Sequence, residues 1–140
     1  MRRGATLPEL SLTLILLGLM LVIALPRIHG VADSLAVSRA ARAIAAAHTR
    51  ARMAAVLRSQ ALELVIEPGA LTIRPAAAAP IWQGQGPAAD EVILAGPPRT
   101  LTFSPVGITT GLSNASFRLT RGEAERTVIV SRLGRVRIVP

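Results

Sequence analysis

Apolar residues form one long run near the start of the chain. From Leu10 to Leu25 the sequence is LSLTLILLGLMLVIAL, sixteen residues without a charge. Extending the run back to Ala5 gives 21 residues that only Glu9 interrupts. Because about 20 apolar residues cross a bilayer as a helix, this pattern predicts a membrane-spanning helix.

After this run, apolar residues recur at roughly helical spacing. Strong helix formers extend from Asp33 to about Ala61 without an internal glycine or proline. The spacing predicts a helix that packs on a sheet, with its arginines on another face. The apolar stripe consists of Val31, Leu35, Ile44, His48, Val56 and Leu57. Pro26, between the two helical segments, is expected to kink or locally break the helix rather than end it.

The rest of the chain alternates apolar and polar residues in short runs that predict strands. The runs at 62–66 and 71–73, joined through Pro68 and Gly69, are typical of a hairpin. Further strands are predicted at 91–95, 99–103, 115–120, 126–131 and 135–139. Residues 75–90 are rich in alanine, proline and glycine and are expected to form a loop anchored by Trp82. One helix followed only by strands predicts an α+β fold, with an antiparallel sheet whose apolar face the helix covers.

Composition narrows the possible functions. Hydrophobic residues make up 51% of the 140 residues, which argues against a disordered chain. There is no cysteine, and the two histidines, His29 and His48, leave little material for a zinc site or a catalytic triad. We therefore expect no cofactor, no metal site and no enzymatic activity. His48 is expected in the seam between helix and sheet, and His29 at a membrane edge.

The chain is strongly basic. It has 16 arginines, no lysine and eight acidic residues, for a formal net charge of +8. Such a protein can face nucleic acid, anionic lipid or an acidic partner. Arg2 and Arg3 precede the apolar run and should hold the N-terminus in the cytoplasm, with the following domain outside.

Glu9 needs an explanation because it is the one charge in the apolar run. An unpaired carboxylate at depth in a membrane costs about 2–3 kcal/mol. Glu9 is therefore either an interfacial residue without a role or the partner of a cation that arrives on assembly, such as another subunit's N-terminal amine. Pro8 is tolerated in the first turn of a helix, where its missing amide donor has no partner to lose. Cleavage after Gly4 would create such a start, with a free amine on Ala5.

The residues from Gly4 to Leu10, GATLPEL, resemble the N-terminus of type IV pilins and pseudopilins when taken with the apolar run. The resemblance implies that prepilin peptidase cuts between Gly4 and Ala5 and that Ala5 is then N-methylated. It also implies that Glu9 pairs with the amine of a neighbouring subunit during assembly. Two residues depart from the family pattern, since Ala5 replaces the usual phenylalanine or methionine and Pro8 replaces an aliphatic residue.

The C-terminal half resembles the GspH/FimT pseudopilins within this family. Phe103-Ser104-Pro105-Val106-Gly107, the strand at 126–131 and Gly134-Arg135-Val136-Arg137 carry the resemblance. It implies a leader peptide at 1–4 and a transmembrane and assembly helix at 5–29. It further implies a periplasmic pilin-like head at 30–140, in which a helix at 30–61 packs on a sheet at 62–140.

These resemblances imply a non-catalytic minor pseudopilin of a type II secretion system or a type IV pilus. Its partners would be other pilin or pseudopilin subunits, prepilin peptidase and the bacterial inner membrane. It would cross that membrane once, with a cytoplasmic N-terminus and a periplasmic head, and would join the pseudopilus on assembly.

An alternative function is DNA binding for uptake in natural transformation. Some FimT-type pseudopilins bind DNA through arginines of a C-terminal Gly-Arg-x-Arg motif, which Gly134-Arg135-Val136-Arg137 resembles. The resemblance implies Arg135 and Arg137, with Arg132 nearby, as candidate residues. In an extended strand Arg135 and Arg137 point to the same side, so both could meet phosphates. Without an aromatic stacking platform, such binding would be sequence-independent and salt-sensitive. Alternating arginines on an edge strand also deter aggregation, which needs no ligand.

Two further interpretations compete with the pilin-like ones. A conventional secretory signal peptide could end at Gly30-Val31-Ala32, before Asp33, although the apolar run is longer than most signal cores. An unrelated domain with a single membrane anchor would require Gly4 and Glu9 to be coincidental.

Overall fold

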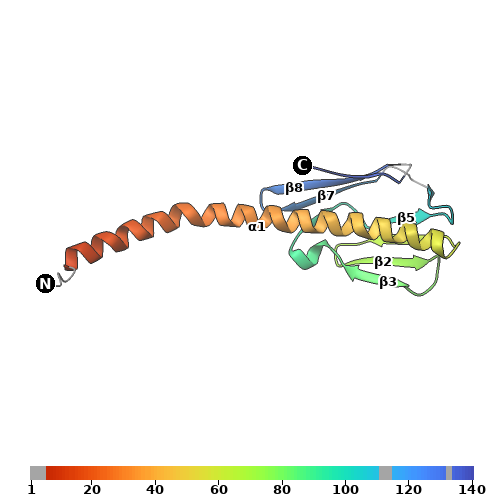
Figure 1. The fold of residues 1–140 in the computed structure, drawn as a ribbon, viewed down its shortest axis with the longest axis horizontal. Helices are drawn as coiled ribbons and strands as arrows, with labels where there is room; N and C mark the ends of the chain where they lie inside the picture. The colour runs from red at the N-terminus through yellow and green to blue at the C-terminus, as the bar shows by residue number, and fades with distance from the viewer. Residues whose placement is uncertain (1–5, 111–114, 132–133) are drawn as a thin grey trace. The chain divides into compact units, whose positions relative to one another are not determined.

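The computed structural model describes residues 6–110, 115–131 and 134–140, except the side chains of 24–28. The chain divides into two compact units, Met1–Ala32 and Asp33–Pro140. Helix α1 (Leu7–Leu57) contributes residues to both units and continues through Pro26, so the prediction that Pro26 does not end the helix is confirmed. We call Asp33–Pro140 the head (Figure 1).

The first turn of α1 explains how Pro8 and Glu9 are accommodated. Thr6 precedes the helix, and its carbonyl accepts the first helical bond from the Leu10 amide at 3.1 Å. The Glu9 carboxylate accepts a hydrogen bond from the Thr6 amide at 3.5 Å. The sequence Thr-x-x-Glu thus forms half of a capping box, and Pro8 occupies a position that needs no amide donor.

Within the head, α1 buries a stripe of small side chains. The buried residues recur at helical spacing and are Ala36, Val37, Ala40, Ala41, Ile44, Ala47, His48, Ala51 and Ala55. The predicted stripe was wrong at Val31, Leu35, Val56 and Leu57, which are all exposed. Small alanine side chains let strands approach the helix closely, whereas larger apolar residues at those positions would have held them apart.

Helix α1 ends at Leu57, four residues before the predicted boundary at Ala61. Ser59 adopts a left-handed conformation, with φ of 48°. The Gln60 amide bonds to the Ala55 carbonyl, and the Ser59 amide bonds to the Val56 carbonyl. These two bonds form a Schellman motif, which is a common way to stop a helix. Serine in place of the usual glycine concealed this stop in the sequence.

The strands of the head form two antiparallel sheets instead of the single sheet predicted. The first sheet has the order β3-β2-β1-β5-β6. Its strands are β1 (Leu62–Ile66), β2 (Ala70–Pro75), β3 (Trp82–Gln85), β5 (Arg99–Phe103) and β6 (Thr109–Thr110). The predicted hairpin is confirmed, because β1 pairs with β2 with Leu64 opposite Ile73.

The second sheet has the order β4-β7-β8-β9. Its strands are β4 (Ile93–Ala95), β7 (Ala115–Arg121), β8 (Ala124–Val130) and β9 (Val136–Val139). In Figure 1, β7 and β8 lie on one side of the head part of α1, and β2 and β3 lie on the other. Alternate residues of both sheets, including Leu64, Phe103 and Leu119, are buried with the alanine stripe in one core.

The predicted loop at 75–90 was wrong in part. It contains β3 and a short 3-10 helix, η1 (Pro87–Asp90). Trp82 is half-buried against the core, as its predicted anchoring role requires, and the Arg50 guanidinium lies 4.7 Å from its ring centroid. Glycine and proline hid this strand because β3 gains its stability from pairing with β2, which local propensity does not register.

Candidate functional site

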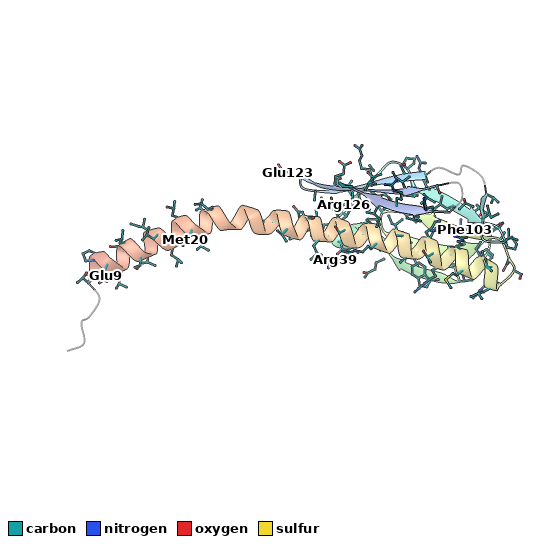
Figure 2. The ribbon with its side chains drawn as sticks, turned by 45° about the horizontal axis from the view of Figure 1, so that its top comes forward. Glu9, Met20, Arg39, Phe103, Glu123 and Arg126 are labelled. Atoms are coloured by element: carbon teal, nitrogen blue, oxygen red, sulfur yellow. The ribbon has the colours of Figure 1, made fainter. Side chains whose placement is uncertain are left out.

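Glu9 is the one predicted assembly residue that lies within the described part of the chain. Gly4 and Ala5 lie outside the described residues. Figure 2 shows Glu9 in the first turn of α1, where its carboxylate is exposed. A carboxylate is favoured at this end of a helix by the helix dipole. Its bond to the Thr6 amide, at 3.5 Å, is long, so the carboxylate can exchange that partner for a stronger cationic one.

The part of α1 that follows Glu9 exposes apolar side chains on every face. Twelve large apolar residues between Leu7 and Ile23 are more than half exposed, among them Leu17 at 57% and Met20 at 70% (Figure 2). The hydroxyls of Ser11 and Thr13 bond to carbonyls of the preceding turn, at 3.0 and 2.8 Å, and so need no outside partner. A helix that is apolar all round is typical of burial in a membrane or a bundle.

Among the described residues, no helix contains a stretch both long and apolar enough to cross a membrane.

Arg121, at the end of β7, joins three segments of the head. Its Nε lies 3.0 Å from Asp33 at the start of the head part of α1. One Nη donates to the Asp90 carbonyl at 2.8 Å, and the other donates to the Glu91 carboxylate at 2.8 Å. Arg121 therefore holds the second sheet and η1 against α1. The sequence carried no signal for this contact because the three acceptors are 30 or more positions away.

Gly122 makes the approach of Asp33 to Arg121 possible. It has φ of +55°, and a Cβ added there would lie 2.5 Å from Asp33 Oδ2. A larger residue would therefore both strain the turn between β7 and β8 and displace the Asp33 carboxylate.

The C-terminal arginines are only partly arranged as predicted. Arg135 precedes β9 instead of lying within it, and its amide bonds to Ser131 Oγ at 3.1 Å. Arg137 lies in β9 opposite Ile129 of β8, and both arginines are exposed. Arg132 lies outside the described residues. Within the described part of the chain, β9 is an edge strand of the second sheet.

His48 lies in the predicted seam and is 2% exposed. Its ring packs edge-on against Phe103, with centroids 5.0 Å apart, and Nε2 has no hydrogen-bond partner among the described residues. Burial, assisted by the Arg52 cation, lowers the pKa of His48 below its ordinary value of 6.5. His48 is therefore a neutral core residue. His29 is exposed in the first unit.

A helix packed by an alanine face on antiparallel sheets, with an exposed apolar segment before it, defines a pilin-like subunit. The family model of type II transport protein GspH matches residues 40–134, well over half of the chain. The chain therefore belongs to the GspH family. This membership agrees with the function expected from the sequence, a minor pseudopilin of a type II secretion system or type IV pilus, and it does not favour the DNA-uptake alternative.

Solved structures show the same fold. The type IV minor pilin FimU of Pseudomonas aeruginosa PAO1, in a P21 crystal, is 22% identical with a TM-score of 0.61, and the match covers 74% of this chain and 88% of FimU. A P65 crystal of FimU matches with 21% identity and a TM-score of 0.58, covering 74% and 92% of the two chains. The comparison with curated protein sequences returned no match.

Proposed function

We propose that the chain is a non-catalytic filament subunit that is cut between Gly4 and Ala5 and methylated on Ala5. Its first unit is inserted in the inner membrane until the subunit is assembled into the filament. The head lies in the periplasm, and Glu9 pairs with the amine of a neighbouring subunit during assembly. Family membership supports the role of structural subunit, as does the fold it shares with FimU, a type IV minor pilin.

The observation that carries the proposal is the exposed apolar surface of the first unit. Burying a large apolar side chain contributes about 1.5–3 kcal/mol. Burial of the twelve exposed ones between Leu7 and Ile23 is therefore worth on the order of 20 kcal/mol. That is more than the net stability of most domains, so this segment needs a lipid or protein environment.

The charge of Glu9 matters because lipid and filament core are similarly apolar. Moving the helix from one to the other yields little hydrophobic free energy, so specific contacts decide the outcome. A carboxylate paired with an amine in a dry environment is such a contact, and removing one partner typically costs about 3–5 kcal/mol. Because Glu9 lies in the first turn, it can reach a cation at the end of a helix without unwinding α1.

The experiment compares Glu9→Gln with Glu9→Ala in cells that assemble the filament. Glutamine keeps an acceptor for the Thr6 amide but removes the charge, whereas alanine removes both. We expect both variants to be cleaved normally and to enter the filament at least tenfold less than the parent chain. Normal incorporation of Glu9→Gln would show that capping, and not charge, is the role of this residue.

Processing is tested separately by mass spectrometry of Gly4→Leu. A bulky residue before the cut should block the peptidase, so the chain should keep residues 1–4 and an unmethylated Ala5. A mature mass identical to that of the parent chain would favour an unrelated membrane-anchored domain.

A further inference from the structure

The head carries an exposed apolar surface at the Leu57 end of α1 that neither its core nor the proposed assembly helix uses. We call it the distal patch, and its residues are Met53, Val56, Leu57, Val106 and Ile108. These residues are 58%, 47%, 80%, 74% and 53% exposed, respectively. Exposed apolar residues that gather at one end of a domain, with polar residues around them, are typical of an interaction site.

The two segments of the distal patch are held together by a tight turn. The Gly107 amide bonds to the Ser104 carbonyl at 2.8 Å, and the Ile108 amide bonds to Ser104 Oγ at 3.2 Å. Gly107 has φ of +77°, and a Cβ there would lie 2.9 Å from Val56 Cγ2. Glycine therefore lets the turn press against α1 at Val56, with Val106 and Ile108 on either side of the contact point in the chain.

Two shallow grooves flank Met53 on the surface of α1. One, of about 310 Å³, runs between Arg52, Met53 and Val56. The other, of about 540 Å³, runs between Arg50, Met53 and Leu57. A flexible methionine between two grooves can adjust to the apolar side chains of a partner.

The rim of the distal patch is cationic. Arg50, Arg52 and Arg58 lie on the same stretch of chain, and none has a carboxylate partner among the described ion pairs. Arg50 stacks on Trp82, and Arg52 approaches the turn at Gly134. Glu63, in the adjacent strand β1, is already paired with Arg74 at 3.4 Å.

Most acids of the head are paired with arginines other than those at the rim. Asp33 and Glu91 contact Arg121, and Asp90 lies 3.8 Å from Arg39. Among the described ion pairs these acids are therefore taken up by other arginines, and the distal patch presents an apolar centre beside the unpaired Arg50, Arg52 and Arg58.

From this surface we infer that the distal patch docks the head of a different pilin-type subunit, one that presents apolar side chains ringed by aspartate or glutamate. The inference rests on the proposed filament function. Complementary charge at the rim sets the orientation and rate of docking, and the apolar centre supplies the burial. A protein occupant fits better than DNA, because phosphates would leave the five apolar side chains in water.

The test uses photo-cross-linking of the full chain in cells that assemble the filament. The photoreactive residue p-benzoylphenylalanine replaces Val106 in one strain and Ile93, which is 67% exposed on β4, in a control strain. We expect position 106, and not position 93, to join a different pilin-type subunit through a peptide that contains aspartate or glutamate. Filament incorporation is measured in the same samples.

A double variant, Leu57→Ser with Arg58→Glu, then removes one apolar contact and reverses one charge of the distal patch. It is made in the chain that carries the cross-linker at position 106, and the yield of the adduct is measured. This pair should lower the adduct at least tenfold. The matched pair Ile93→Ser with Arg99→Glu, also exposed but outside the patch, should lower it less than twofold. Changing the cross-linked carboxylate of the partner to arginine should restore the adduct with Arg58→Glu, which a merely misfolded head would not allow.

The outcomes separate this inference from the proposed function. A chain that enters filaments but gives no adduct from position 106, or an adduct that survives Leu57→Ser with Arg58→Glu, overturns the docking surface alone. An adduct with a second copy of the chain or with DNA also overturns it. A parent chain that never enters filaments overturns the proposed function first.

Discussion

Helix α1 has one part before the head and one part in the head, and the two differ in the size and exposure of their apolar side chains. From Leu7 to Ile23 the helix is rich in leucine and exposes large side chains all round, whereas in the head it buries a stripe of alanines. Large side chains suit an environment supplied from outside, such as lipid or other helices. Small ones suit a fixed contact with the chain's own sheets, where close approach maximises packing. One continuous helix thus serves two purposes through side-chain size alone.

The largest expected contrast is between truncations in the two parts. Phe103→Ala removes a fully buried ring that packs on His48, and should lower the free energy of unfolding of the head by about 3–5 kcal/mol. Leu17→Ala, in the exposed part of α1, should leave that free energy unchanged. Chemical denaturation of the full chain in detergent measures both. An equal loss in the two variants would contradict the separation of the units.

Substitution of a buried alanine in the stripe should give the next largest change in the stability of the head. Ala51 is fully buried, so Ala51→Leu should push the sheets away from α1 and destabilise the head by about 1–3 kcal/mol. Ala46, on the exposed face of the same helix, is the matched control, and Ala46→Leu should change stability by less than about 0.5 kcal/mol. Similar denaturation midpoints for the two variants would show that close approach of the sheets is unimportant.

A smaller loss of unfolding free energy is expected where ion pairs and hydrogen bonds, and not packing, hold α1 against the rest of the head. Arg121→Met removes the bonds to Asp33, Asp90 and Glu91 and should cost about 1–2 kcal/mol of unfolding free energy. Arg118→Met removes one exposed pair with Glu125, which is worth less than about 1 kcal/mol. Urea denaturation measures the free energy of unfolding of both variants. A larger loss in Arg118→Met than in Arg121→Met would contradict this prediction.

The smallest effect is a pH dependence that belongs to the head alone. The pKa of His48 is lower in the folded state than its ordinary value of 6.5, so the unfolded chain binds the proton more readily. Stability should be full above pH 6.5 and fall as the pH drops below it, by at most about 1.4 kcal/mol between pH 7.5 and 5.5. His48→Leu should remove this slope in urea titrations at the two pH values. A slope that persists in the variant would assign the effect to other groups.

The order of elements could be predicted from the sequence because it depends on local pattern. The hairpin around Pro68 and Gly69 and the strand at Arg99–Phe103 form where alternation placed them. The Thr-x-x-Glu spacing of Thr6 and Glu9, which forms half of a capping box, is also a local signal for the start of a helix. Helix length was overestimated because a serine, and not a glycine, makes the left-handed turn after Leu57.

The sequence by itself determined the apolar first segment, the helix-then-strands order and the resemblance to the GspH family. Those features depend on residues close together in the chain. Only the tertiary structure decided which face of α1 is buried, that the strands divide into two sheets, and that Arg121 reaches Asp33. It also decided that the turn at Gly107 lies beside Val56 in the distal patch. Each of these depends on contacts between residues 20 or more positions apart, whose free energy exists only after the chain has folded.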